Sequence, residues 1–282
     1  MNKPGRQSKD FNEILNIQTT LNVTNEKWDS IFHNWDNPLE CNSNKRPTGC
    51  TICNELKKGN VVINNNKKYT ANILIVGDIH KRLDIIHKLM NKYDCPIIST
   101  GDLDLNLSDK IDKLPYPLYI IKGNHDIYNI SDIQTLTKYN IIYPGNDFLL
   151  NNKILIFGGI YSSKKTYQLS STLEGKNKRF FTIEDIEKIL NNNRGKQPNI
   201  LITHQAIANI LPLNEKIKVE EGCELLNKLV DTFKPFYYIH GHHHITYNNM
   251  YGKIKCFGLS NLNLDPKAYV IYNLLTNEIY NN

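Results

Sequence analysis

The pattern of apolar and polar residues along the chain becomes regular at residue 70. From there, short apolar runs alternate with stretches in which apolar residues recur at helical spacing. Residues 82–90 show this helical spacing between two apolar runs, 73–76 and 96–100. A strand–helix–strand order predicts parallel β-α-β units, because parallel neighbours need a crossover connection. We therefore expect an α/β fold.

The same pattern predicts further elements. Strands are expected at residues 116–122, 153–160, 199–203, 237–240, 254–259 and 268–274. One helix is expected to begin after Thr182, with Asp185 at the third helical position completing a capping box, and another at residues 220–233. The last two strands are expected to form or extend a second sheet.

Residues 1–69 differ in composition from the rest of the chain. They are rich in Asn, Lys and Asp and contain both tryptophans, Trp28 and Trp35. The polar run 64–68 near their end is predicted to be a linker or an exposed turn. We therefore expect an N-terminal extension at 1–69 and a domain at 70–282.

The net charge of +6 gives weak support for a nucleic-acid partner. The chain has 29 Lys but only 5 Arg, together with 39 Asn, and base readers depend on the bidentate Arg side chain. No apolar run approaches the roughly 18 residues that span a bilayer. The first ten residues lack the apolar core of a signal peptide. We expect no membrane partner and a cytoplasmic location.

Five polar clusters follow predicted strands in the regular part of the sequence. They are Gly77–His80, Gly101–Asp102, Gly123–Asp126, Thr203–His204 and Gly241–His244. Each lies at or just after the carboxyl end of a strand, where ligand sites of open α/β sheets assemble. The clusters are therefore expected to form one site.

The residue types in these clusters are typical of metal ligands. Asp78 and His80 are two residues apart, so their side chains point to one side of an extended segment, and His242 and His244 repeat this spacing. Gly241 is expected to permit a sharp turn before that pair. Mixed oxygen and nitrogen ligands without thiolate favour Mn²⁺, Fe or Zn²⁺ over Ca²⁺. A pair of such ions promotes in-line displacement at phosphorus and generates hydroxide near neutral pH.

The ordered motifs D-x-H, G-D, G-N-H-D, a lone His and G-H-x-H resemble the calcineurin-like metallophosphoesterase superfamily over residues 70–282. The resemblance implies a β-sandwich with helices on both outer faces, in four layers α/β/β/α. It also implies a metal-dependent phosphoester hydrolase, either a phosphodiesterase or a phosphomonoesterase, that uses a hydroxide bridging two divalent ions. Two alternatives stay open: a nucleic-acid-processing nuclease or debranching-type enzyme, and a non-enzymatic metal-binding scaffold of the same fold.

The resemblance further implies a role for each matching residue. Asp78, His80 and His244 would bind the first ion, Asp102 would bridge, and Asn124, His204 and His242 would bind the second ion. His125 would contact the substrate phosphate and act as general acid, and Asp126 would hold its ring. His240 and His243 are expected to be neighbouring or core residues rather than ligands.

Departures from the family pattern indicate which branches of the superfamily this chain resembles least. Lys81 occupies a position where many relatives have Gly, and Gly101–Asp102 lacks the Asp-Arg-Gly continuation of Ser/Thr phosphoprotein phosphatases. The segments 140–143 and 156–161 resemble small esterases related to RNA lariat debranching enzymes. Debranching enzymes commonly have Cys where this chain has Asp78, which disfavours lariat specificity.

Two further groups of residues are candidates for binding. His33, Cys41, Cys50 and Cys53 form a candidate Cys₃His structural zinc site, with an ordinary reduced segment as the alternative. Lys164, Lys165, Lys176, Lys178 and Arg179 lie in a long segment that either caps the site and contacts extra phosphates or is a solvated loop.

Overall fold

The computed structural model describes residues 58–59, 62–64, 67–105, 108, 110–126, 129–150, 152–212 and 222–281. The chain divides into two compact units, Met1–Ala71 and Asn72–Asn282. In the first unit, β1 (Val62–Asn64) pairs with the antiparallel strand β2 (Lys67–Tyr69), with Val62 opposite Tyr69. Within the run 64–68 that was predicted to be a linker or an exposed turn, Asn64 lies in β1 and Lys67 and Lys68 lie in β2, and residues 65–66 are outside the described residues.

The second unit contains two six-stranded mixed sheets. The strand order of the first sheet is β14-β13-β3-β4-β5-β6. Its strands are β3 (Asn72–Val76), β4 (Ile97–Ser99), β5 (Leu118–Ile120), β6 (Ile141–Ile142), β13 (Tyr269–Asn273) and β14 (Glu278–Asn281). The run from β3 to β6 is parallel, and β13 lies antiparallel to β3.

The second sheet has the order β11-β12-β10-β9-β8-β7. Its strands are β7 (Asp147–Leu149), β8 (Ile154–Phe157), β9 (Ile200–Thr203), β10 (Tyr237–His240), β11 (Tyr247–Tyr251) and β12 (Ile254–Gly258). The central run β8-β9-β10-β12 is parallel, and the edge strands β7 and β11 are antiparallel to their neighbours.

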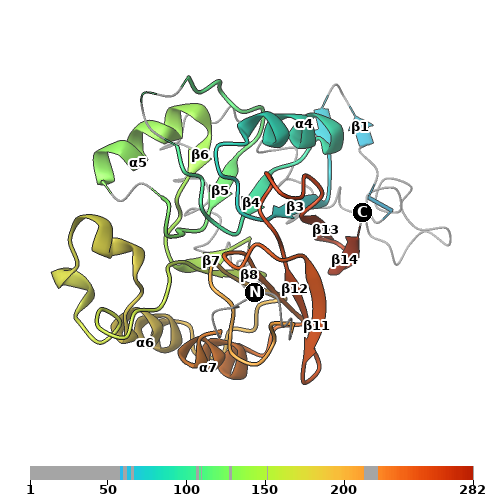
Figure 1. Ribbon diagram of the computed structural model, residues 1–282. Helices are drawn as coiled ribbons and strands as arrows, with labels where there is room; N and C mark the ends of the chain where they lie inside the picture. Colours follow the sequence, from blue (N-terminus) through green and yellow to red (C-terminus); the bar gives the residue numbers. More distant parts are fainter. Residues whose placement is uncertain are drawn as a thin grey trace, which may run out of the picture. The chain divides into compact units, whose positions relative to one another are not determined.

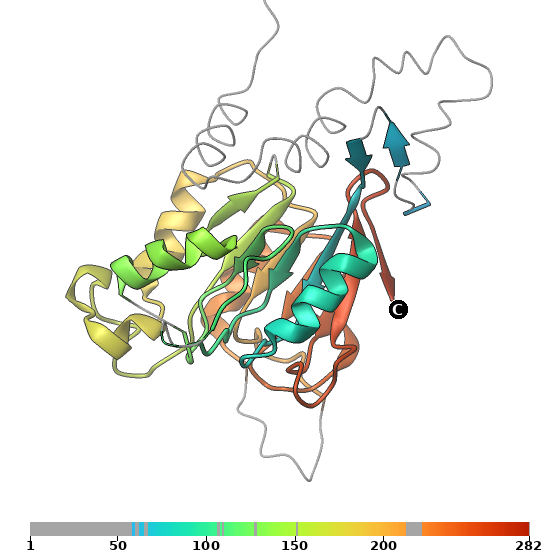
Figure 2. The ribbon, with the colours of Figure 1, turned by 90° about the horizontal axis from the view of Figure 1, so that it is seen from above.

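Helices lie on the outer sides of the two sheets. α4 (Leu83–Tyr93) and α5 (Ile130–Leu136) accompany the first sheet, whereas α6 (Ile183–Asn192) and α7 (Glu224–Phe233) accompany the second (Figures 1 and 2). Buried residues of α6 and α7 pack with Leu155, Leu201 and Tyr238 in one hydrophobic core. This arrangement confirms the predicted α/β fold with two sheets between helices.

Local sequence signals account for several helix boundaries. Thr182 caps α6: its hydroxyl accepts from the Asp185 N–H, and its own N–H donates to Asp185 Oδ2 at 2.8 Å. The predicted capping box is therefore confirmed. α4 ends at Asp94, whose left-handed conformation stops the helical hydrogen bonding. α7 begins at Glu224, later than the predicted residue 220, and residues 213–221 are outside the described part of the chain.

The two strands predicted last divide between the sheets. β12 extends the second sheet beside β10, but β13 joins the first sheet beside β3. The helix α5 and the strands β6, β7, β11 and β14 were not predicted. All four of these strands lie at sheet edges, and β11 has the sequence Tyr-Asn-Asn-Met-Tyr, which has no regular apolar alternation.

Among the described residues, no helix combines the length and the apolar character needed to cross a membrane.

Shortening a buried side chain in the centre of β9 should destabilise the fold. Leu201 is fully buried between α6, α7 and the second sheet, so Leu201→Ala should lower the free energy of unfolding by about 2–5 kcal/mol. The control Leu169→Ala, at a leucine that is 61% exposed, should change it by about 0.5 kcal/mol or less. Chemical denaturation followed by circular dichroism measures both. Equal losses would contradict this assignment of the core.

Candidate metal centre

The alignment of neighbouring strands brings the five polar clusters to the same end of the two sheets. Val76 of β3 lies opposite Ser99 of β4, and Ser99 lies opposite Ile120 of β5. In the second sheet, Thr203 of β9 lies opposite His240 of β10. The parallel strands of each sheet therefore end side by side, and the residues that follow them meet at the same end of the sandwich. This is the arrangement that the sequence predicted.

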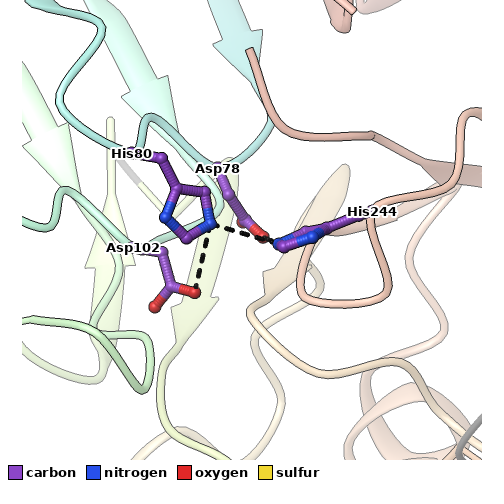
Figure 3. Close-up of side chains that lie close together, drawn as sticks. All are labelled: Asp78, His80, Asp102 and His244. Carbon is purple, nitrogen blue, oxygen red and sulfur yellow. Dashed lines mark hydrogen bonds and ion pairs between the residues drawn. The ribbon is translucent and has the colours of Figure 1, made fainter. Parts of the chain in front are cut away.

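Four of the predicted ligands form a compact group. One ligand atom from each of Asp78, His80, Asp102 and His244 lies within 4.8 Å of the others (Figure 3). The Nε2 atoms of His80 and His244 are 3.2 Å apart, and His244 Nε2 is 3.3 Å from Asp78 Oδ2. His80 Nε2 lies 3.8 Å from Asp102 Oδ2. Two carboxylates and two imidazoles thus converge on one position.

The remaining predicted ligands lie on the other side of Asp102. His204 Nε2 is 2.9 Å from Asn124 Oδ1 and 3.6 Å from Asp102 Oδ1. The rings of His204 and His242 have centroids 4.9 Å apart. Asp102 therefore directs Oδ2 toward the first group and Oδ1 toward the second.

Hydrogen bonds behind the ligands fix their orientation. His204 Nδ1 lies 2.9 Å from the Thr100 carbonyl oxygen, so its N–H donates there and Nε2 is left as the ligand atom. The Thr100 hydroxyl donates to Asp78 Oδ1 at 2.9 Å, and the His242 N–H donates to Asp78 Oδ2 at 2.8 Å. Thr100 was not identified from the sequence, although a hydroxyl residue directly before Gly101–Asp102 at a strand end is a usable signal.

The charges of the group fit a bound cation. Among the described residues, the ion pairs of Asp78 and Asp102 are all with histidines, and both carboxylates are almost completely buried. Burial raises the pKa of Asp78, but His204, His244 and Thr100 together outweigh it and bring that pKa below its usual value. Burial lowers the pKa of His204, whereas Asp102 and Asp78 raise it, and the net direction is upward. A divalent ion compensates buried carboxylates of this kind.

The ligand-bearing segments are not extended. His80, His242 and His244 have φ angles of 41°, 64° and 54°, and Asp102 has 46°. The prediction that the i, i+2 spacing of an extended strand aligns these side chains is therefore wrong. Left-handed turns aim them instead, at a cost of about 1–3 kcal/mol per strained residue.

Gly241 is required for a reason other than the predicted sharp turn. Its φ is not positive, but a Cβ atom at this position would collide with Asp78 Oδ1 and Thr100 Oγ1. The histidine loop can therefore approach the Asp78 carboxylate only because residue 241 has no side chain.

His125 and Asp126 have different surroundings. The His125 ring is exposed and lies with its centroid 5.5 Å from that of His80, at the edge of the metal centre. Asp126 is buried, and its oxygens accept from the backbone N–H groups of Gly123 at 2.6 Å, Leu103 at 2.7 Å and Asp102 at 3.2 Å. The Tyr143 hydroxyl also donates to it, at 3.1 Å.

These contacts give Asp126 a role other than the expected one. Both of its oxygens hold the 123–126 loop against the 102–103 loop, and none of its described hydrogen bonds reaches the His125 ring. Burial, and secondarily the charge of Asp102, raise the pKa of Asp126 to about 6. Asp126 therefore positions ligand-bearing backbone rather than an imidazole.

His240 and His243 do not join the ligand groups, in agreement with the prediction. His240 is buried, with Nδ1 2.9 Å from the Gly241 carbonyl oxygen and Nε2 2.6 Å from the Tyr247 hydroxyl. Burial lowers its pKa to about 4. His243 Nε2 accepts a hydrogen bond from the Ala206 N–H. The candidate zinc residues His33, Cys41, Cys50 and Cys53 are outside the described residues.

A family model described as calcineurin-like phosphoesterase matches residues 71–246, well over half of the chain. The chain belongs to the calcineurin-like phosphoesterase family. It is a metal-dependent hydrolase that acts on phosphoester bonds, and the Asp/His group is its candidate metal-binding site. Comparison with curated proteins found no match.

Structure comparison found solved structures with low sequence identity to this phosphoesterase, and the first one below is similar in fold. One crystal structure is 13% identical and has a TM-score of 0.55, covering 74% of this chain and 97% of that chain. A second, from Thermus thermophilus, is 12% identical with a TM-score of 0.47, over 74% of this chain and 97% of its own. A structure described as a novel archaeal phosphodiesterase is 14% identical with a TM-score of 0.38, over 74% and 97%.

The hydroxyl of Thr100 should contribute to metal affinity. Thr100→Val removes the donor to Asp78 Oδ1 without changing the side-chain shape, so Mn²⁺ affinity should fall about 10- to 100-fold. Isothermal titration calorimetry of metal-stripped protein measures this change. The control is Thr172→Val, whose exposed hydroxyl donates only to the Leu169 carbonyl among the described groups. Unchanged affinity in Thr100→Val would show that this hydrogen bond does not orient the ligand.

Proposed function

We propose that the phosphoesterase hydrolyses its substrate with two divalent ions that share Asp102. The observation that carries this proposal is the orientation of Asp102, which directs Oδ2 toward His80 and Oδ1 toward His204. Asp78, His80 and His244 would hold one ion, and Asn124, His204 and His242 the other. Oxygen and imidazole donors without thiolate suit Mn²⁺, Fe or Zn²⁺.

When bound, the ions would supply Lewis-acid stabilisation of the phosphoryl oxygens and a water-derived nucleophile near neutral pH. The protein fixes the positions of the ligands before substrate arrives. Asp78 is held by Thr100 and by the His242 N–H, and the His125 N–H donates to Asp102 Oδ1 at 2.8 Å. Because the carboxylates of Asp78 and Asp102 are buried and held by these contacts, little reorganisation is required during the reaction.

His125 is the group that this proposal places against the substrate. Its ring is exposed beside His80, whereas its backbone N–H is tied to Asp102. The ring is therefore accessible from solvent but held at a fixed distance from the metal ligands. In this position, a protonated imidazole can donate to the leaving oxygen of a phosphodiester or phosphomonoester as a general acid. The complete set of seven candidate ligands disfavours a non-enzymatic scaffold.

Loss of the shared carboxylate should abolish turnover. Asp102→Ala and His242→Ala should each reduce hydrolysis of bis-p-nitrophenyl phosphate in the presence of Mn²⁺ by at least about a hundredfold. Metal analysis should show that Asp102→Ala binds fewer ions than the wild type. The control Asp84→Ala removes an exposed carboxylate that pairs with Arg82 and should change neither value. Wild-type turnover in Asp102→Ala would refute the two-ion assignment.

The general-acid role of His125 should depend on the leaving group. His125→Ala should keep the wild-type metal content, because the ring is not a ligand. Its kcat should fall about 10²- to 10⁴-fold with an alkyl phosphodiester, whose alkoxide needs a proton. With bis-p-nitrophenyl phosphate the loss should be much smaller, because p-nitrophenolate leaves without one. Equal losses with both substrates would point to phosphate binding alone.

A further inference from the structure

A cavity of about 230 Å³ is lined in part by Lys122, which precedes the candidate ligand Asn124 by two residues. Its walls include Lys122 after β5, Asn146 before β7, Gly158 after β8, and Lys178 in the 3₁₀ turn Gly175–Arg179. Leu173 and Phe181 supply an apolar wall. The cavity therefore opens at the carboxyl ends of β5 and β8, at the same end of the sandwich as the metal ligands.

The strand order places this cavity next to the metal centre. The ligands follow β3, β4 and β5 in one sheet and β9 and β10 in the other, and β8 is the neighbour of β9. The Gly159 N–H donates to the Lys122 carbonyl at 2.6 Å, which joins the two sheets at this point. Lys122 also lies only two residues before the ligand Asn124. A substrate extending from the metal centre along the sandwich would enter the cavity.

The charged groups of the cavity favour an anion. Two lysines, the half-buried Lys122 and the exposed Lys178, line the cavity together with one carboxylate, Asp185. The Asp185 oxygens accept hydrogen bonds from Thr182 and Ser170, and the positive groups outnumber the negative one. The Asn146 oxygen accepts from the Gly158 N–H at 2.8 Å, so its amide nitrogen is the group that can donate to a ligand. The cavity lining thus carries two lysines against one carboxylate, together with an amide donor.

We propose that this cavity binds a second phosphoryl group of the substrate, carried on the same sugar or polyol as the scissile phosphoester. The proposal rests on the proposed hydrolysis at the metal centre. The volume equals that of about eight liquid water molecules, enough for a phosphoryl group with part of its sugar or polyol. Lys122 and Lys178 neutralise the second phosphate, and Leu173 and Phe181 contact the carbon skeleton. The substrate class is therefore a bisphosphorylated ester.

A matched pair of chromogenic esters tests the proposal. Thymidine 3′-phosphate 5′-(p-nitrophenyl phosphate) and thymidine 5′-(p-nitrophenyl phosphate) differ only in the second phosphate. Wild-type kcat/KM for p-nitrophenolate release should be at least about tenfold higher with the first ester. Lys178→Met should reduce this ratio toward one. The control Lys176→Met, on the same exposed turn but outside the cavity wall, should retain it.

The same pair built on glycerol identifies the source of the phosphate. A preference on both skeletons shows recognition of the phosphate itself, and a preference on only one shows recognition of a nucleotide-borne or a polyol-borne phosphate. Equal kcat/KM values for both members of each pair would overturn the proposal. A ratio that falls equally in Lys176→Met and Lys178→Met would also overturn it, because general surface charge would then explain the preference.

A binding experiment separates this proposal from the proposed hydrolysis. Calorimetry should show that wild-type protein binds thymidine 3′,5′-bisphosphate at least about tenfold more tightly than thymidine 5′-monophosphate, and that Lys178→Met loses this difference. If no ester is cleaved, the proposed hydrolysis fails, and the calorimetric difference still decides whether the cavity binds a second phosphate. Equal affinities for the two nucleotides would refute the cavity assignment.

Discussion

The burial of two carboxylates between the sheets is the constraint on which the rest of this phosphoesterase depends. Asp78 and Asp102 are 0% and 1% exposed, and among the described residues their ion pairs are all with histidines. Leaving a carboxylate charged at such a position is expensive unless a cation or many donors compensate it. Hydroxyl and backbone donors provide part of this compensation, and the proposed divalent ions would provide the rest. The stability of this end of the sandwich and its chemistry are therefore linked.

Two features of the fold place these carboxylates: parallel strands that end side by side, and loops with left-handed backbone conformations. Parallel neighbours in register bring several loops to one level, and left-handed turns at His80, Asp102, His242 and His244 then aim the side chains inward. Each strained turn opposes folding, so the packed strands on either side must stabilise it. Because Gly241 has no side chain, the histidine loop can approach the Asp78 carboxylate without a steric clash.

The sequence allowed the reaction class to be predicted more reliably than the role of each residue. Ordered clusters after apolar runs predicted which side chains converge, because strand ends in parallel sheets meet at one edge. The role of Asp126 was not predictable from its place beside His125. Its oxygens accept from the backbone N–H groups of Gly123 in its own loop and of Leu103 in a loop that is distant in sequence, and hydrogen bonds of the second kind have no residue pattern. Thr100 was not predicted, although a hydroxyl residue directly before Gly101–Asp102 is a usable signal. The short edge strands β6 and β7 carry too few residues to show a period, and β11 has no regular apolar alternation.

The sequence by itself determined the α/β alternation, the capping of α6 by Thr182 and Asp185, and the set of side chains able to bind metal. These properties depend on local periodicity, on neighbours three or four residues apart, and on the chemistry of each residue type. Only the tertiary structure decided that Asp102 directs one oxygen to each ligand group, and that Lys122 and Lys178 share a cavity beside them. Those relations join loops from two different sheets, and their geometry is fixed by how the sheets pack rather than by any spacing along the chain.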